Sequence, residues 1–551
     1  MKFKTNLIVI VLLTLFFLQC VLSMKEKSTT FDEGNHLISG YTHLIMHDLR
    51  MTPEQPPLTK ILSGLPLLFL NLKNPNEFES WNLTKEAKYI DAYKFSNEFL
   101  YHSGQDADKI LFLGRLPSVF IALLLGYFVF LWTKQLYGLP CGYFALFLYA
   151  FSPNIIAHSQ VVTPDIGLSC IILITLYYLR KFLKTKSYKT FLISSLCLGI
   201  ALLTKFSALI LLPLFLVIFY FYLPERLDKK PVWKFILLYF FLMLFIAFII
   251  VWLGYGFEYG NILLKKESHP SAVQLLSKYL PSKHIDFLIN LLEKIKIPFP
   301  SFFLGIAQIK LPLRDTFVWG KYYQGSPWFG YLFAFLIKTP IPSLIFIFVT
   351  LYYFLRKKTL SPKEEWFLLI PVIGFLFFST IARFGLQLKY ILPIYPFLFI
   401  FSSQIIKLPI LNQFKYKLIF ALLCLWYLIG TLNIYPHYLA YFNEFVGGAK
   451  NGYKYLVDSN LDWGQDLKLL KQYLEKNNIK EIYLAYFGTA EPDYYKINYK
   501  KLEPFKKVSG IIAISATYLQ GVHTAKGGYD WLKKYEPVDN LGYSILIYNI
   551  K

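Results

Sequence analysis

Charged residues are scarce in this chain. Only 17% of its 551 residues are Asp, Glu, Lys or Arg, whereas 55% are hydrophobic and 19% are aromatic. An ordinary soluble domain carries about 25% charged residues. This composition excludes a soluble globular protein and indicates a polytopic α-helical membrane protein.

Cysteine and nucleotide-binding motifs are also scarce or missing. The five cysteines all lie in apolar segments, so we interpret them as packing residues and not as the disulfides of an exported domain. The sequence contains no Walker motif and no glycine-rich dinucleotide fingerprint after a strand, and no predicted cytoplasmic loop could hold a nucleotide-binding domain. Cytosolic nucleotide donors are therefore excluded.

Long apolar runs dominate what is present. The first resembles a signal peptide, but it reaches roughly 18 residues and no A-x-A-like site follows, so we expect an uncleaved first span, with cleavage as the alternative. A joined run is divided at Lys205, because a charge at mid-membrane depth is costly. About eleven runs can cross a bilayer, near residues 6–23, 110–133, 139–157, 164–180, 190–204, 206–223, 235–253, 331–355, 365–381, 390–406 and 417–434.

The distribution of Lys and Arg predicts the orientation. Lys or Arg is frequent in the connections near 180–189, 224–234, 356–363 and 407–417, which places them and the N-terminus in the cytoplasm. The chain then consists of a membrane domain over 1–434, with a first extracytoplasmic loop at 24–109, and an extracytoplasmic tail over 435–551. Because the tail holds 15 Lys against 12 Asp and Glu, no basic face for nucleic acid emerges.

The tail has the pattern of a small α/β domain. Apolar residues recur at helical spacing from Trp463 to Leu474, after Asp462 as a plausible N-cap. The sequence also predicts three strands, over residues 481–488, 510–519 and 543–550. In a calcium loop that starts at Asp458, Gly would be the sixth residue and Glu the twelfth, but this chain has Trp463 and Leu469 there, so an Asx-turn is the better account.

Two adjacent acids, Asp32 and Glu33, follow the first apolar run. Thr30 and Glu33 fit a capping box, so Glu33 can simply cap a helix over 31–48. Asp32 is a candidate general base, because a partly desolvated carboxylate at the membrane face can have its pKa raised. Asp165 lies at the start of the fourth span, on the same outer membrane face as Asp32. It either caps that helix or is a further acid of the site.

Cations are predicted at the same depth. Arg115 lies about one turn into the second span, from which its side chain can reach a phosphate at the outer face. The turn "MTPEQPPLTK" carries Glu54 and Lys60 and either lines a head-group groove or anchors the surface. His36, His43 and His47 share a predicted helix face, a polar face rather than a metal site. Further cations predicted near this face are Lys205, Lys338, Arg383 and Lys389.

Acids and cations together suggest transfer chemistry outside the cytoplasm. Because nucleotide-sugars are not generally available there, an activated group must arrive on a carrier that crosses the bilayer, and a phosphate-linked lipid fits. Cations would stabilise the departing phosphate while a carboxylate removes the proton of an acceptor hydroxyl.

Several ordered motifs carry a family resemblance. They are "FDEGNHLISGY", "PEQPPLTK", "GRLPSVF", "FSPNIIAHSQVVTPD", "GIALLTKFSALILL", "KYILPIYPF" and "YFNEFVGGAKNGYKYLVDSNLDWGQDL". Together they resemble the bacterial relatives of the protein O-mannosyltransferases, in the GT-C class of polyprenyl-phosphate-dependent glycosyltransferases. The resemblance covers most of the chain.

This resemblance implies roles for individual residues. Asp32, with Glu33 beside it, and Asp165 match the family's acids, and Arg115 matches the Arg associated with the donor phosphate, with Lys205 and Lys338 as secondary candidates. Candidates for substrate contact are His36, Glu54, Gln55, Lys60 and Lys389.

The resemblance also implies an inverting transfer of a hexose such as mannose, without a metal or other cofactor, to a protein, lipid or glycan hydroxyl. Aminoarabinose transferases carry Lys where this chain has Gln55, and an Arg near the positions of Asn35 and His36, which argues against that sugar. Two alternatives stay open, a flippase for a lipid-linked sugar and a non-catalytic envelope scaffold. Neither paired halves nor an internal repeat supports the flippase.

Overall fold

The computed structural model describes residues 2–83, 89–222, 232–262, 281–292, 294–308, 315–383 and 385–551. Part of one connection used above for the orientation, residues 224–231, lies outside the described residues. The chain divides into two compact units. The first unit comprises Met1–Glu33, Ala107–Val161 and Leu313–Lys551, and the second comprises Gly34–Asp106 and Val162–Pro312.

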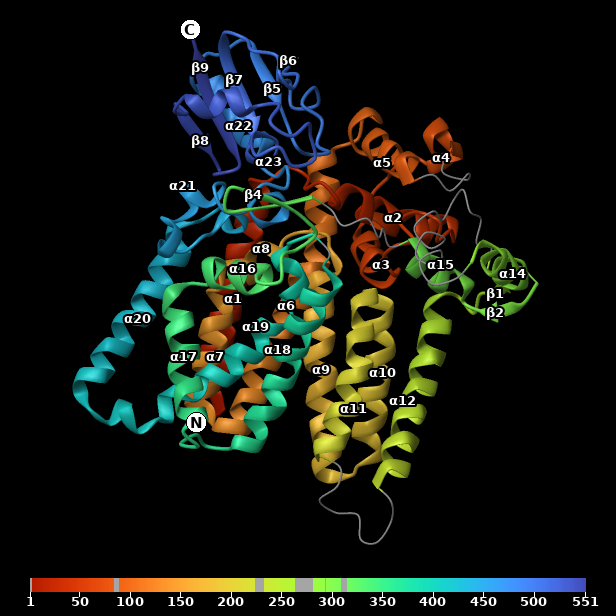
Figure 1. Ribbon diagram of the computed structural model, residues 1–551, viewed down its shortest axis with the longest axis vertical. Helices are drawn as coiled ribbons and strands as arrows, with labels where there is room; N and C mark the ends of the chain where they lie inside the picture. The colour runs from red at the N-terminus through yellow and green to blue at the C-terminus, as the bar shows by residue number, and fades with distance from the viewer. Residues whose placement is uncertain are drawn as a thin grey trace. The chain divides into compact units, whose positions relative to one another are not determined.

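The first unit contains a bundle of apolar helices and the tail (Figure 1). Helix α6 packs against α1 and α7, and α19 packs against α6, α7 and α18. The Tyr149 hydroxyl, buried in this core, donates a hydrogen bond of 2.6 Å to the Ala122 carbonyl. The bundle consists of α1 (Lys2–Lys25), α6 (Ala107–Tyr137), α7 (Leu139–Ala150), α8 (Pro153–Ser159), α16 (Gly330–Lys338), α17 (Ile341–Leu355), α18 (Pro362–Ala382), α19 (Ile394–Ser402) and α20 (Phe414–Asn433).

Two predicted spans are bent sharply in the structure. The axis turns by 62° between α7 and α8, and by 116° between α16 and α17. Pro153 and Pro340 lie at these breaks. Because proline has no backbone N–H and excludes the preceding residue from helical geometry, each position stops one helix and starts the next.

The tail is the predicted α/β domain. Its five strands have the order β6-β5-β7-β9-β8, in which β6, β5 and β7 are parallel and the last two pairings are antiparallel. The predicted strands are confirmed as β5, β7 and β9, except that the second ends at Ser515 and residues 516–519 form helix α23. The elements are α21 (Ala449–Gly452), α22 (Leu467–Lys476), β5 (Ile482–Ala485), β6 (Tyr499–Lys501), β7 (Gly510–Ser515), α23 (Ala516–Leu519), β8 (Asp539–Leu541) and β9 (Ile545–Ile550), with a separate hairpin of β3 (Asp315–Val318) and β4 (Lys321–Gln324).

The predicted start of the tail helix is wrong by four residues. Helix α22 begins at Leu467 after Asp466, whereas the sequence pattern placed its start at Trp463 after Asp462. The segment 463–466 hydrogen-bonds other parts of the first unit, and the Asp462 carboxylate accepts from the Thr517 and Gly464 N–H groups. Tertiary contacts therefore override the local helical period.

In the second unit, α9, α10 and α12 pack side by side (Figure 1). The predicted division at Lys205 is confirmed, because α10 ends at Thr204 and Lys205 is extended. The elements are α2 (Glu33–Met46, whose first residue ends the first unit), α3 (Leu58–Gly64), α4 (Glu79–Leu83), α5 (Tyr89–Asn97), α9 (Pro164–Thr185), α10 (Tyr188–Thr204), α11 (Leu211–Tyr222), α12 (Val232–Gly254), β1 (Tyr259–Asn261), α14 (Ser282–Leu292), β2 (Lys296–Pro298) and α15 (Pro300–Gln308).

The apolar helices make this a multi-pass membrane protein. Among the described residues, six helices are long and apolar enough to cross a membrane, or up to eight if each bent pair is one span. Large apolar side chains stay exposed on them, including Phe120 at 57%, Phe241 at 61% and Phe377 at 57%, as lipid-facing surfaces require. The count of about eleven spans stays a prediction.

Helices α2 and α3 approach each other through Gly40. A Cβ atom at this position would lie 1.8 Å from the Lys60 carbonyl oxygen, so Gly40→Ala must push the helices apart. We expect it to lower stability by about 3 kcal/mol, measured as the thermal unfolding midpoint in detergent. Gly430→Ala in α20 is the control, because nothing lies within 4 Å of its Cβ. Equal midpoints for the two variants would contradict this packing.

Candidate active site

The loop 24–33 joins α1 to α2 and is held by one buried arginine of α6. The Arg115 side chain is 1% exposed, and its Nε and Nη2 donate to the two Glu33 carboxylate oxygens at 2.8 and 2.7 Å. Its remaining N–H groups donate to the backbone carbonyls of Met24, Lys27 and Ser28 at 2.9 to 3.1 Å. A guanidinium has five N–H donors, and all five have acceptors in this one loop.

Glu33 has both a capping contact and a charge partner. The predicted contact with Thr30 is confirmed, since the Thr30 N–H donates to the Glu33 carboxylate at 3.1 Å, and α2 begins at Glu33. The ion pair with Arg115 was not predicted. A direct phosphate contact by Arg115 stays a prediction, and it would require one of the five hydrogen bonds to open.

The tail motif "DSNLDWGQD" lies against the same loop. The Phe31 N–H donates to the Trp463 carbonyl at 2.9 Å, and the Ser28 N–H donates to the Gln465 carbonyl at 3.0 Å. The Phe31 ring also stacks on Phe487 of the tail, with 5.0 Å between centroids. The first loop and the tail therefore form one structure, although more than 400 residues separate them in sequence.

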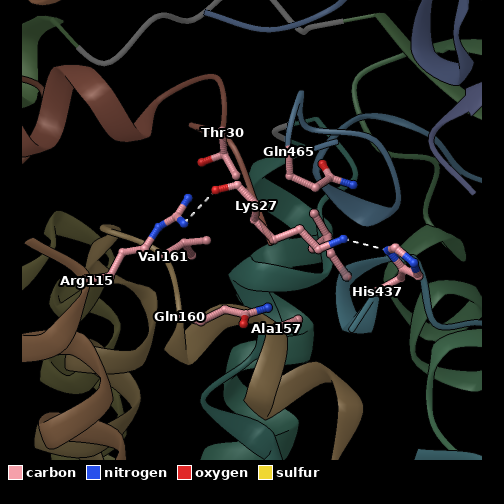
Figure 2. Close-up of a pocket in the computed structure, with 9 residues that line it drawn as sticks. Lys27, Thr30, Arg115, Ala157, Gln160, Val161, His437 and Gln465 are labelled. Carbon is pink, nitrogen blue, oxygen red and sulfur yellow. Dashed lines mark hydrogen bonds between the residues drawn. The ribbon is translucent and has the colours of Figure 1, made fainter. Parts of the chain in front are cut away.

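A second buried charge cluster joins this loop to the tail. Lys27 Nζ donates to the Asp466 carboxylate at 2.6 Å and lies 2.6 Å from His437 Nδ1. Burial raises the pKa of Asp466, but the charges of Lys27 and His437 outweigh it and hold the pKa well below its usual range. Figure 2 shows Lys27 reaching towards His437 above a small cavity that Arg115 and Gln160 also line.

Asp32 has a different environment from its neighbour Glu33. Its side chain is 28% exposed, and its carboxylate lies 3.6 Å from Lys389 Nζ. Lys389 is 9% exposed and sits 4.0 Å above the Trp463 ring centroid, a cation–π contact. The structure thus brings Asp32 and Lys389 together beside the tail, whereas Lys338 donates to the Leu439 carbonyl at 2.9 Å and to the Asn460 carbonyl.

Other predicted site residues lie in the second unit. Asp165, in the first turn of α9, accepts from Lys205 Nζ at 2.6 Å, and both side chains are buried. Lys60 Nζ donates to the Thr52 and Gln55 carbonyls at 2.9 Å, which fixes the Pro-rich turn that also carries Glu54. His36 is buried in α2. Among the residues that the structure describes, no group of three or more His, Cys, Asp or Glu has metal-binding geometry.

Sequence reasoning missed several groups of this site. Lys27, Asp466 and His437 were not predicted, and neither were Gln387 and His523, which contact Asp458. The available signal was the unusual density of acids in "DSNLDWGQD", three within nine residues. Its partners could not be found because they lie far away in sequence.

Comparison with known proteins agrees with this architecture. Residues 108–252 match the family model described as dolichyl-phosphate-mannose-protein mannosyltransferase, and no curated protein sequence matches the chain. The structure of ArnT from Cupriavidus metallidurans bound to undecaprenyl phosphate has 12% identity and a TM-score of 0.51, over 98% of this chain and 97% of that one. The apo form of the same ArnT has 12% identity and a TM-score of 0.52, over 99% of this chain and 97% of that one.

A further similar structure is the archaeal oligosaccharyltransferase AglB from Archaeoglobus fulgidus, in complex with an inhibitory peptide and a dolichol-phosphate. It has 12% identity and a TM-score of 0.46, over 97% of this chain and 72% of that one. The likeness to ArnT shows a GT-C fold over nearly the whole chain, and residues 108–252 are similar to the mannosyltransferase family model. The bundle with a sheet-containing tail is thus confirmed as a GT-C architecture.

The Arg115–Glu33 pair gives a stability prediction. Arg115→Met leaves the Glu33 carboxylate buried without its partner, which costs about 3–5 kcal/mol. Arg115→Met/Glu33→Met removes both charges and should regain most of that loss. Thermal unfolding in detergent measures both variants, with Arg115→Lys expected in between because Lys has three donors instead of five. A double variant no more stable than Arg115→Met would contradict the prediction.

Asp462 gives a pH prediction. Burial, opposed by hydrogen bonds from Thr517 and Gly464, raises the pKa of Asp462 to about 7. The unfolded carboxyl titrates near 4, so between about pH 4 and 7 the folded chain holds a proton that the unfolded chain has released, and stability falls as pH rises through this window.

Asp462→Asn should remove this slope. We expect the unfolding midpoint of the wild type to fall relative to Asp462→Asn between pH 4.5 and 7.5, a range in which the lowered pKa values of Asp458 and Asp466 keep both ionised. Parallel midpoint curves for the two proteins would contradict the assignment.

Proposed function

We propose that this protein is a membrane glycosyltransferase. It moves a sugar, a hexose such as mannose, from a polyprenyl-phosphate carrier to an acceptor hydroxyl at the extracytoplasmic face of the cell membrane. The N-terminus lies in the cytoplasm, and the loop 24–33 and the tail lie outside. The transfer inverts the anomeric centre, with Asp32 as general base.

The observation that carries this proposal is the contrast between two adjacent acids. Glu33 is fully buried against Arg115. Asp32 keeps 28% of its side chain exposed, on a loop that Arg115, Lys27 and the tail hold from several sides. A catalytic base needs a fixed position and access to its substrate, and the contacts of the loop and the exposure of Asp32 support this role.

The chemical step follows from this geometry. The acceptor oxygen attacks the anomeric carbon while its proton passes to an Asp32 oxygen, and the carbon–oxygen bond to the phosphate breaks. The electron pair leaves with the polyprenyl phosphate. Lys389 Nζ lies 3.6 Å from the Asp32 carboxylate, so a cation borders the proposed base.

The donor class rests on the comparisons and on the absent nucleotide motifs. The matching family model describes transfer from dolichyl-phosphate-mannose, and the ArnT structure was solved with undecaprenyl phosphate. We extend a polyprenyl-phosphate donor to this chain. Arg115 stays the leading candidate for the phosphate contact, with Lys205 and Lys338 as secondary candidates. The side chains carry this transfer without a metal.

Asp32→Asn tests the proposed base. Purified protein in proteoliposomes receives radiolabelled polyprenyl-phosphate mannose and a panel of peptide, glycoside and lipid hydroxyl acceptors. We expect Asp32→Asn to reduce transfer about 10²- to 10⁴-fold, the usual contribution of a general base. Asp315→Asn is the control, because this carboxylate is 43% exposed and paired with Lys526 on the surface.

Other results of this assay would separate the alternatives. Undiminished transfer by Asp32→Asn would show that another group is the base. Labelled lipid that crosses the vesicle membrane without any transfer would favour the flippase. A wild type with neither activity would favour the scaffold.

A further inference from the structure

A second carboxylate, Asp458, lies on the tail side of Lys389. It belongs to the short turn at Asp458–Asn460, outside the membrane-spanning helices. Burial raises its pKa, but a hydrogen bond from His523 and the charges of His523 and Lys389 lower it to about 2. Lys389 therefore interacts with two carboxylates, Asp32 in the loop 24–33 at 3.6 Å and Asp458 in the tail through its charge.

Asp458 is held by three donors. The Ser459 N–H donates to Oδ1 at 2.6 Å, and Gln387 Nε2 donates to Oδ2 at 3.0 Å. His523 Nε2 lies 3.3 Å from the same Oδ2. These partners come from three separate segments, namely the turn itself, the connection before α19 and the loop after α23, so the fold gathers them at one point.

The backbone of the pair is unusual. Asp458 and His523 both have φ of 59°, in the left-handed region that non-glycine residues rarely occupy. The His523 ring stacks on Phe487 at 5.1 Å with an interplanar angle of 3°, and Phe487 stacks in turn on Phe31 beside Asp32. Such backbone conformations tend to cluster at ligand-binding positions.

Two buried acceptors at this point have no donor among the described residues. Gln387 is 3% exposed and its amide nitrogen is bound to Asp458, yet its Oε1 has no hydrogen-bond partner within the described part of the chain. The Ser459 Oγ, also buried, has none among the same residues. A buried amide oxygen without a donor is costly, so a bound group with hydrogen-bond donors would complete it.

We propose that Asp458, Gln387, Ser459 and His523 form a subsite for the hydroxyl groups of a saccharide acceptor, next to the base Asp32. Carboxylate, amide and hydroxyl oxygens offer acceptors, and the His523 imidazole can offer either role. A ligand that matches this set has several hydroxyls close together, as a sugar ring does. This subsite deepens the proposed function. It rests on that function, because the bound saccharide is an acceptor only if the protein transfers a sugar.

The position of the subsite favours the acceptor over the donor. Asp458 and His523 belong to the tail, and their side chains are 17% and 34% exposed. The polyprenyl chain of the donor must stay in the bilayer, whereas an acceptor sugar can approach from the aqueous side. Lys389 interacts with both Asp32 and Asp458, which connects the subsite to the proposed base.

Binding without a donor tests the subsite separately from transfer. Full-length protein in lipid nanodiscs, free of glycoside detergent, is mixed with the methyl glycosides of glucose, galactose, mannose and N-acetylglucosamine, and saturation-transfer NMR measures binding. We expect at least one glycoside to bind and Asp458→Asn to weaken it by about tenfold or more. His523→Phe, which keeps the ring stack on Phe487, should weaken it as well.

The control is Asp530→Asn, whose exposed carboxylate pairs with Lys533 elsewhere in the tail. It should bind as the wild type does. No binding of any of the four glycosides, or equal binding by His523→Phe and the wild type, would overturn the subsite. Binding of an acetylated Ser/Thr peptide in place of every glycoside would overturn the saccharide class.

The two proposals fail in different experiments. Transfer that survives Asp32→Asn removes the base but leaves glycoside binding and its loss in Asp458→Asn untouched. Glycoside binding that is indifferent to Asp458 and His523 removes the subsite, whatever the transfer assay shows.

Discussion

The candidate site depends on the buried ion pair between Arg115 and Glu33. Removing two charges from water is costly, and attraction between them repays that cost only when the remaining donors and acceptors are also satisfied. Here the guanidinium meets that condition, because its other N–H groups bind three backbone carbonyls of the loop 24–33. One helix thereby fixes the connection between α1 and α2, most of which has no regular secondary structure.

The tail contributes side chains directly to the candidate site. Trp463 lies under Lys389, Asp466 binds Lys27, and the Thr489 hydroxyl donates to the Phe31 carbonyl at 3.0 Å. Lys468 also pairs with Asp108 at the start of α6, at 2.8 Å. The sheet beneath these contacts has a buried core of its own, so it presents the 458–467 segment on a rigid support.

The sequence was informative where the physical signal is local. Apolar runs predicted the helices, short apolar segments of the tail predicted β5, β7 and β9, and a single charge predicted the break at Lys205. The capping contact between Thr30 and Glu33 was also within reach, since three residues separate them.

Contacts between distant segments carry no such local signal. The pairs Arg115 with Glu33, Lys27 with Asp466, and Asp458 with His523 join residues 65 to 439 positions apart. The start of α22 was misplaced for the same reason, because the partners of residues 463–466 lie in the loop 24–33. The sequence singled out Asp32 as a candidate base. It placed Lys389 only among several cations at the same predicted membrane depth and did not predict that Lys389 lies beside Asp32.

The contact between the loop 24–33 and the tail also restricts how the chain threads the membrane. Two segments that share hydrogen bonds must lie on the same side of a bilayer, so the polypeptide between residue 33 and residue 458 crosses it an even number of times. With α1 as a crossing of its own, the total is odd. Neither six crossings nor eight gives an odd total. The number of crossings therefore depends on whether each bent pair counts as one span and on whether a shorter apolar helix also crosses the membrane.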